Sequence, residues 1–270
     1  MVEEFSRRRV RPQGPTPQPA VKHQLRGPGS RPIGHPGGQC PLAGVHRVCE
    51  PGSVIELRQD GDLFLMDFGE GDHRFNPESI ARIHQVLDEV EQAPGPRALV
   101  TVASGKIWHN GLDLDWLGAN RERLDEFLGA VQGLMARMLV LPVPTVAAIQ
   151  GHCFAAGAMF ALAHDTRMMR ADRGFFCLPE IDIQMSFPDG MATLVQSRLN
   201  PSVAYEAMTT GRRYGGSDAA VDAIVHAALG EAELRPAAEA WARANADKDP
   251  KVLGAIKRTV SAAPLRALLS

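Results

Sequence analysis

Hydrophobic and polar residues follow a regular pattern over most of the chain. The stretches VIELRQ and DLFLMDF, joined by Asp60-Gly61, predict a β-hairpin, because Asp-Gly supplies the positive φ of a tight turn. Asn76-Pro77 predicts the start of a helix that ends at Pro94. The apolar positions of that helix are Ile80, Ile83, Leu87 and Val90. The stretch RALVTVAS then predicts a strand.

The middle of the chain predicts a buried strand between two helices. Residues 121–141 have the apolar spacing of an amphipathic helix that is stopped by Pro142. The run from Thr145 to Ile149 is short, apolar and β-branched, which is typical of a strand covered on both faces. Small residues then lead into a helix that begins near Ala155. Its first N–H groups lack intrahelical acceptors, so they favour negative charge.

The last third of the chain is predicted to be mostly helical. The stretches TRMMRA and GFFCL read as short strands, and the apolar spacing beyond Met191 is helical. The helices expected there cover residues 191–199, 201–210, 218–228, 232–246 and 250–269. Strands alternating with helices, followed by helices alone, favour an α/β fold with a helical C-terminal region.

Residues 1–45 differ in composition from the rest. They hold 8 of the 20 prolines and 7 of the 26 glycines. Seven Lys or Arg against two Glu give them a net charge of +5, which leaves −7 of the total −2 for the remainder. Such a segment cannot bury enough apolar surface to order itself, so we expect a disordered, solvated arm. Contact of this basic arm with nucleic acid or phospholipid is the weaker alternative.

The whole chain, with 270 residues of which 44% are hydrophobic, can form one globular domain with a sizeable core. Its small net charge does not indicate nucleic acid or a membrane as a partner. The four cysteines form no CxxC pair and no zinc-like spacing with histidine. Reduced thiols, no metal and a cytoplasmic location are therefore expected. No apolar run reaches the roughly 18 residues of a membrane span, and the N-terminus lacks the apolar core of a secretory signal.

Two glycine-bearing loops are candidates for a functional site. The loops GKIWHNGLDLDW and GHCFAAG each follow a strand and precede a helix. In an α/β layer such turns collect at one edge of the sheet, where ligands usually bind. Two backbone N–H groups aimed at one point would form an oxyanion hole. The motifs GxGxxG, GxxxxGK[ST] and GxSxG are absent, which argues against dinucleotide, P-loop and serine-hydrolase sites.

Four motifs together resemble the enoyl-CoA hydratase/isomerase (crotonase) superfamily. They are GKIWHNGLDLDW, PTVAAIQGHCFAAGAMFALAHD, MRADRGFFCLPEIDI and TGRRYGG, within about residues 52–265. The second and third are most similar to the isomerases that convert 3-enoyl-CoA to 2-enoyl-CoA. The resemblance implies a crotonase-like ββα spiral core over residues 46–210, with residues 211–270 as the helical C-terminal region of the same domain. It also implies an acyl-CoA substrate and no separate cofactor, since coenzyme A is part of the substrate.

The resemblance also assigns roles to individual residues. It places one oxyanion N–H on Leu112 and the other on Ala156, within an Ala-Ala-Gly triplet where hydratases usually carry three glycines. It places Met159 where hydratases carry their first catalytic glutamate, and a thioether cannot activate water. The second family glutamate matches Glu180.

One carboxylate is enough to move a double bond. Glu180 could take a proton from carbon 2 and return it at carbon 4, while the oxyanion donors stabilise the dienolate. Without the resemblance, Glu180 after Pro179 would be read as a surface carboxylate at a turn rather than as a catalytic residue. Asp189 is a second candidate for the base, because some isomerases of the superfamily place theirs in the loop that Pro188 to Gly190 matches.

Further residues are expected to contact the substrate or a second subunit. An apolar wall that excludes water and raises the carboxylate pKa would comprise Met159, Met185, Phe187 and Trp116. The resemblance places Asn110 near the adenine of coenzyme A, and Lys106 and Arg58 could face its phosphates. Family members usually form trimers or dimers of trimers through their C-terminal helices, so a homotrimer or homohexamer is expected. His109 and His152 are assigned no chemistry.

The sequence therefore predicts isomerisation of 3-enoyl-CoA to 2-enoyl-CoA. Two alternatives stay open. One is another crotonase reaction, enoyl-CoA hydration or acyl-CoA thioester hydrolysis, that uses Asp189 or a histidine. The other is a protein that binds acyl-CoA without turnover.

Overall fold

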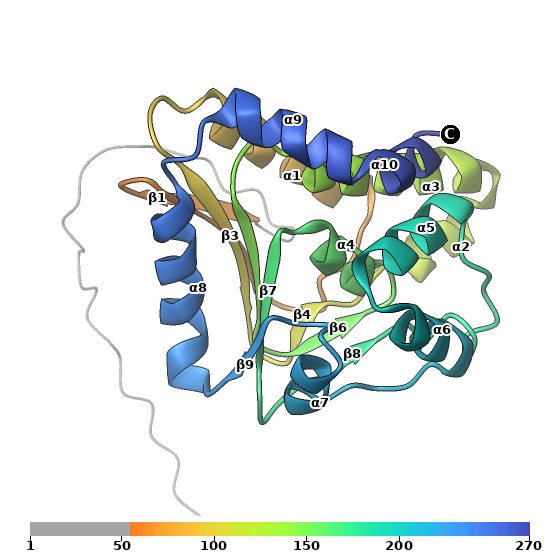
Figure 1. The fold of residues 1–270 in the computed structure, drawn as a ribbon. Coiled ribbons are helices and arrows are strands. Elements are labelled where there is room, and N and C mark those ends of the chain that lie inside the picture. The colour runs from red at the N-terminus through yellow and green to blue at the C-terminus, as the bar shows by residue number, and fades with distance from the viewer. Residues whose placement is uncertain (1–54) are drawn as a thin grey trace, which may run out of the picture. The chain divides into compact units, whose positions relative to one another are not determined.

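The computed structural model describes residues 55–270, and the arm predicted for residues 1–45 lies outside this range. Within it the chain forms nine strands and ten α-helices (Figure 1). The strands are β1 (Glu56–Asp60), β2 (Leu63–Glu70), β3 (Ala98–Ser104), β4 (Ile107–His109), β5 (Thr145–Ile149), β6 (His152–Phe154), β7 (Thr166–Arg170), β8 (Phe176–Cys177) and β9 (Ala227–Leu229). The helices are α1 (Pro77–Gln92), α2 (Leu114–Ala119), α3 (Leu124–Leu139), α4 (Ala156–Ala163), α5 (Asp189–Arg198), α6 (Pro201–Thr210), α7 (Gly216–Val221), α8 (Glu231–Asn245), α9 (Pro250–Val260) and α10 (Ala262–Leu268).

The larger sheet has six strands in the order β1-β2-β3-β5-β7-β9. Strands β1 and β2 pair antiparallel across the turn at Asp60-Gly61, where Gly61 has a φ of 63°. The predicted hairpin is therefore confirmed. The other neighbours in this sheet are parallel, and such pairing needs the long connections that the intervening segments supply.

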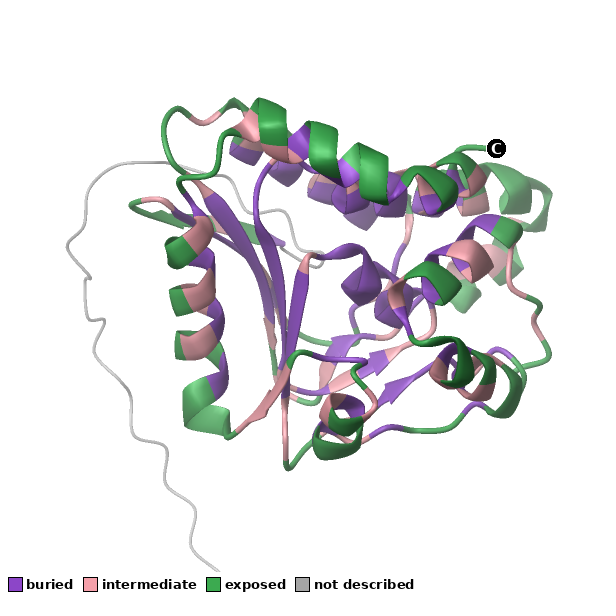
Figure 2. Cartoon of the chain, in the orientation of Figure 1, coloured by how far each residue is buried: buried purple, intermediate pink, exposed green. Residues whose placement is uncertain are grey.

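Two hydrophobic cores lie on opposite faces of this sheet, because successive side chains of a strand point to opposite sides. On one face, residues such as Val100 and Ala148 pack against small side chains of α8, among them Ala238 and Ala242. The other face packs against α1, α3 and α4. Figure 2 shows the result of this packing: the central strands β3 and β5 are largely buried, and α8 is buried only along the side that faces the sheet.

The start of α1 follows from its sequence. The Asn76 side chain accepts a hydrogen bond from the Ser79 backbone N–H at 2.9 Å, and the Ser79 hydroxyl accepts one from the Asn76 N–H at 2.9 Å. This reciprocal capping, with Pro77 at the first helical position, satisfies groups that the helix itself leaves unpaired. The predicted helix is confirmed.

A second, three-stranded sheet has the order β4-β6-β8 and is parallel throughout. Strands β4 and β6 lie in stretches that the sequence predicted as a loop and a turn. Each is only three residues long, so their pairing comes from tertiary contacts and leaves no local signal. The short helix α2 was missed for the same reason.

Three expectations for the helical parts are corrected. The helix expected over 218–228 is the shorter α7, and the alanine-rich stretch after it forms β9, paired with β7 at the sheet edge. Pairing with an existing sheet outweighs the helix propensity of alanine there. The helix expected over 250–269 is divided at Ser261 into α9 and α10. The helix expected over 121–141 begins with a 3-10 turn at Arg121–Arg123.

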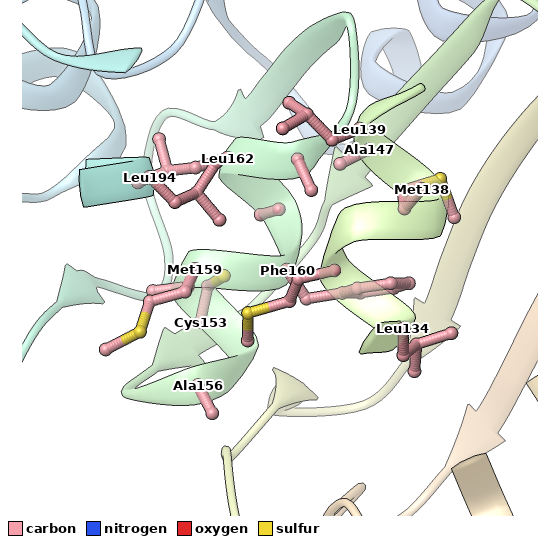
Figure 3. Close-up of a cluster of buried hydrophobic side chains, with 14 of the residues drawn as sticks. Leu134, Met138, Leu139, Ala147, Cys153, Ala156, Met159, Phe160, Leu162 and Leu194 are labelled. Atoms are coloured by element: carbon pink, nitrogen blue, oxygen red, sulfur yellow. The ribbon is translucent and has the colours of Figure 1, made fainter. Parts of the chain in front are cut away.

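Helix α4 is buried at every position and forms the centre of the larger core. Figure 3 shows Met159, Phe160 and Leu162 of α4 between side chains of α3, such as Leu134, and Leu194 of α5. The C-terminal helix α10 packs against α5 and α3. The boundary between a core and a C-terminal region at residue 210 stays a prediction.

Helix α9 is held to the rest of the protein by a buried lysine. The ammonium group of Lys257 donates to the Asp165 carboxylate at 2.6 Å and to the Val143 carbonyl at 2.8 Å. Asp165 also accepts from the backbone and hydroxyl of Thr145. Among residues 55–270, no helix is both long and apolar enough to cross a membrane.

Candidate active site

Three segments leave the small parallel sheet at the same end and meet. Strand β4 leads into Asn110 to Leu112, β6 leads into Ala155 and α4, and β8 leads into Glu180. Because parallel strands present their carboxyl ends at one edge, the pairing of β4 with β6 and of β6 with β8 brings the three together. A further hydrogen bond, from the Ala155 N–H to the Cys177 carbonyl at 3.0 Å, fixes the last two.

The N–H group of Leu112 has no acceptor in the described part of the chain. Phe75 pairs with this segment by donating its N–H to Gly111 at 2.7 Å and accepting from the N–H of Asp113 at 2.9 Å. In such a bridge the amide of the intervening residue points to the opposite side. Within residues 55–270, no backbone or side-chain group accepts a hydrogen bond from it.

The N–H group of Ala156 is free for a different reason. Ala156 is the first residue of α4, so its N–H has no intrahelical acceptor. The preceding residue, Ala155, has φ 51° and ψ −129° and offers no side-chain cap. No other group in the described part of the chain accepts from Ala156, so the partial positive charge of the helix start is open to a ligand.

Glycine at position 111 brings the two donor segments together. A Cβ atom at Gly111 would lie 2.9 Å from the Cβ of Ala155 and 3.2 Å from the amide nitrogen of Ala156. Gly111 also has a φ of 89°, which side chains rarely tolerate. Both observations require glycine and place the Leu112 and Ala156 segments in contact.

Glu180 lies in a tight turn after β8. The N–H of Ile183 donates to the Pro179 carbonyl at 3.1 Å, and the N–H of Met185 donates to the Glu180 carbonyl at 2.9 Å. Glu180 is only 7% exposed, and among residues 55–270 no group forms a hydrogen bond with its Oε2 atom. Burial raises its pKa to about 7, against the lowering effect of a backbone hydrogen bond. The surface-carboxylate reading of Glu180 is therefore wrong.

These groups lie around one pocket of about 250 Å³. Leu112, Ala156 and Glu180 all line it. Its apolar lining includes Leu128 of α3, Met159 of α4, Met185 and Met191 of α5, and its polar lining includes Arg74 and Asn110. The pocket thus has two unpaired N–H donors, one buried carboxylate and apolar walls, which suits stabilisation of an oxyanion and transfer of a proton.

The predicted substrate residues divide into two groups. Asn110, Met159 and Met185 line the pocket, and the Asn110 side chain also donates to Asp72 at 2.6 Å. Trp116 and Phe187 do not line it. Trp116 packs its ring 5.0 Å from that of Phe127, outside the pocket.

Other candidates also lie away from the pocket. Asp189 is the exposed first residue of α5 and does not line the pocket. Lys106 is exposed in the turn before β4. Arg58 is on β1, where its guanidinium lies 2.7 Å from the Glu56 carboxylate. Phe187 packs against the main core.

Several lining residues were missed by the reasoning from sequence. Arg74 lines both this pocket and an adjoining polar cavity of about 510 Å³, where Glu70, Asp72 and Asp113 also lie. Ile183 lines the pocket although it is 44% exposed. Its signal was the alternation of apolar and polar residues in EIDIQ, where Ile181 is the other apolar residue. Residues 55–270 contain no group of three or more His, Cys, Asp or Glu side chains that could hold a metal ion.

Two plant proteins are similar in sequence to this chain. The chain is 38% identical over 190 residues to enoyl-CoA delta isomerase 2, peroxisomal, of Arabidopsis thaliana, which covers 67% of this chain and 79% of that protein. It is 37% identical to enoyl-CoA delta isomerase 3 of the same plant, over 65% and 76% of the two chains. The similarity to the isomerase branch expected from the sequence is thus confirmed.

Solved structures establish the fold. An enoyl-CoA hydratase/isomerase family protein from Pseudomonas syringae superposes with a TM-score of 0.75 at 22% identity, over 79% of this chain and 93% of that one. An apo enoyl-CoA isomerase of Mycobacterium tuberculosis gives a TM-score of 0.72 at 22% identity, with the same coverage. The expected crotonase-like fold is confirmed. Residues 70–269 match the family described as enoyl-CoA hydratase/isomerase, and the chain belongs to that family.

Proposed function

We propose that this protein isomerises 3-enoyl-CoA to 2-enoyl-CoA, with Glu180 as the single base. The observation that carries the proposal is a buried carboxylate, one oxygen of which lacks a hydrogen-bond partner within residues 55–270, in the same pocket as two backbone N–H groups without acceptors there. The names of the plant relatives, enoyl-CoA delta isomerases, support it.

In this reaction the thioester oxygen of the substrate accepts from the N–H groups of Leu112 and Ala156. Glu180 takes a proton from carbon 2, and negative charge moves onto the thioester oxygen to give a dienolate. The two donors stabilise that charge as it develops, and loss of one such donor typically costs on the order of 3 kcal/mol in the barrier. Glu180 then returns the proton at carbon 4, which completes the shift of the double bond.

The pKa of Glu180 suits this task. A carboxylate whose pKa is raised to about 7 is ionised in a large fraction of molecules near neutral pH and is still a stronger base than an exposed glutamate. Met159 occupies the wall where a second carboxylate would be needed to activate water, and it is 1% exposed. A single proton carrier in an apolar pocket favours isomerisation over hydration.

The direct test is an assay of the purified protein with 3-hexenoyl-CoA, following formation of the conjugated 2-enoyl thioester. We expect a product of unchanged mass and no turnover by the Glu180→Ala variant. A product heavier by one water molecule would indicate hydration, and release of free coenzyme A would indicate thioester hydrolysis. Tight binding of acyl-CoA with no turnover of any thioester would favour a non-catalytic binding protein. Retention of activity in Glu180→Ala with loss in Asp189→Asn would move the base to Asp189.

The polar lining of the pocket suits the coenzyme A part of the substrate. It includes Asn110 and Arg74, whereas the methionines and Leu128 belong to the apolar lining. We propose that no separate cofactor is needed, because Glu180 and the two N–H groups supply every proton and charge contact of the reaction. Retention of full activity after dialysis against a chelator is the expected result.

Self-association is a further part of the proposal. Helix α9 exposes Val252, Ile256 and Val260, spaced four residues apart along one face, at 58%, 54% and 74% of their surfaces. Such a row is suited to burial against a second copy of the chain, in a homotrimer or homohexamer. Light scattering of the purified protein would give the mass. The proposed location is the cytoplasm, and the free buried thiols of Cys153 and Cys177 suit a reducing compartment, although a relative is named peroxisomal.

A further inference from the structure

A buried histidine lies between the two proposed oxyanion donors. His109 is the last residue of β4 and is only 2% exposed. Its ring nitrogen Nδ1 accepts a hydrogen bond from the N–H of Gly111 at 3.2 Å. Gly111 immediately precedes Leu112, so this bond fixes the peptide next to the first donor.

The same histidine supports the second donor segment. Gly157, which follows Ala156 in the first turn of α4, packs directly on His109. A Cβ atom at Gly157 would lie 2.7 Å from the His109 carbonyl oxygen, and 2.8 Å from both its Cβ and its Nδ1. No side chain fits between them, so the first turn of α4 packs against the imidazole ring and the backbone of His109.

The imidazole is held in one orientation and one charge state. Its ring centroid lies 4.0 Å from that of Phe75 and 5.4 Å from that of Phe68. Burial, and after it the charge of His73, lowers the His109 pKa to about 3, so the ring is neutral at physiological pH. A neutral imidazole that accepts at Nδ1 carries its proton on Nε2, and protonation of Nδ1 would remove the acceptor.

We propose that His109 is a positioning residue for the oxyanion hole: its Nδ1 holds Gly111, and its contact with Gly157 holds α4, so that the N–H groups of Leu112 and Ala156 converge. This inference depends on the proposed function of those two amides. His109 itself does not line the pocket, so it acts through the backbone and does not touch the substrate.

Leucine and asparagine at position 109 form a matched pair of variants. The two side chains have nearly the same size and shape, but only asparagine offers an oxygen close to where Nδ1 accepts. We expect His109→Leu to lower kcat for 3-hexenoyl-CoA by about 10- to 100-fold, because a misplaced donor loses much of its stabilisation of the transition state. His109→Asn should keep kcat within about fivefold of the wild type. The KM and the affinity for hexanoyl-CoA, which carries no developing charge, should change less than threefold in both.

His164 supplies the control for the general effect of replacing a buried histidine. It is fully buried at the other end of α4, its pKa is also lowered to about 3 by burial, and its nitrogens bond to Thr101 at 2.8 Å and the Phe160 carbonyl at 2.9 Å. His164→Leu should lower thermal stability at least as much as His109→Leu and leave kcat per folded molecule unchanged.

Equal kcat values for His109→Leu and His109→Asn would overturn the positioning role, as would an equal loss in His164→Leu. If the smaller side chains prevent folding, His109→Met and His109→Gln give a second pair with the same contrast. The protection of the Gly111 amide from hydrogen exchange provides a readout that is independent of turnover. It should be high in the wild type and the asparagine variant and low in the leucine variant. Absence of isomerase activity in the wild type would reject the proposed function, whereas the exchange pattern would still report on the bond.

Discussion

Replacement of Glu180 by glutamine should remove activity and at the same time stabilise the protein. A carboxylate that is buried away from water costs free energy whenever it is ionised, and glutamine has nearly the same shape but stays neutral. The Glu180 pKa rises from the reference value of 4.5 to about 7 on folding. At roughly 1.4 kcal/mol per pH unit, this corresponds to about 3 kcal/mol of destabilisation when the group is ionised.

The sign of the effect defines a pH window. The folded protein binds the Glu180 proton more tightly than the unfolded chain, so the contribution of Glu180 to the free energy of unfolding falls as the pH rises from 4.5 to about 7. Below that window both states are protonated and the variant should match the wild type. Above it the variant should be more stable by up to about 3 kcal/mol, which is roughly 6 to 12 °C in Tm for a chain of this size.

Thermal melts of both proteins at half-unit steps from pH 5 to pH 8.5 measure this difference, together with kcat/KM for 3-hexenoyl-CoA. The difference in Tm should grow up to about pH 7 and then level off, and wild-type kcat/KM should rise tenfold per pH unit below about 7 and level off above it. If the difference in Tm between the variant and the wild type were the same at all pH values, or if kcat/KM did not depend on pH, Glu180 would not be a buried base. The Asp189→Asn variant, altered at an exposed position, should follow the wild type in both measurements.

Three further changes test other parts of the structure. Ala155→Gly should raise Tm by a few degrees, because a residue with φ 51° and ψ −129° is strained by about 1 kcal/mol when it carries a Cβ; a lower Tm would contradict this backbone geometry. Lys257→Met should lower the free energy of unfolding in denaturant titrations by about 3 kcal/mol, because it leaves the Asp165 carboxylate without its cation. The double variant that also carries Asp165→Asn should recover part of this loss. Met159→Glu should yield some hydrated product of 2-enoyl-CoA, detectable by mass, at the cost of stability because the position is 1% exposed; an unchanged product spectrum would weaken the one-base argument.

Local signals in the sequence were sufficient for much of the fold. The Asp60-Gly61 turn and the Asn76-Pro77 helix start are determined by residues within a few positions of each other, and both are where the pattern placed them. Strands β4, β6 and β9 were not predicted, because three-residue strands have no periodicity of their own and form only when a neighbour is present.

For the candidate site, too, the features determined by nearby residues were predicted better than those that depend on tertiary packing. The backbone donors and Glu180 follow motifs in consecutive loops, and these loops do converge on one pocket. The apolar wall was predicted from residues near those motifs. Of these, Met159 and Met185 line the pocket, whereas Trp116 and Phe187 do not. Whether a side chain on a neighbouring turn points toward a pocket depends on packing between helices, which sequence spacing does not specify.

The bond between Lys257 and Asp165 has a consequence for how the chain folds. The two residues are 92 positions apart, so a ribosome adds the lysine 92 residues after the aspartate. At 5 to 20 residues per second, a ribosome needs on the order of 5 to 20 seconds to add that stretch. Until then the nascent protein has the Asp165 carboxylate, already next to Thr145, without the ammonium group that neutralises it. The final folding step is therefore expected to wait for the C-terminal helices, and chains shortened before residue 257 should be recognised by chaperones and proteases as unfinished.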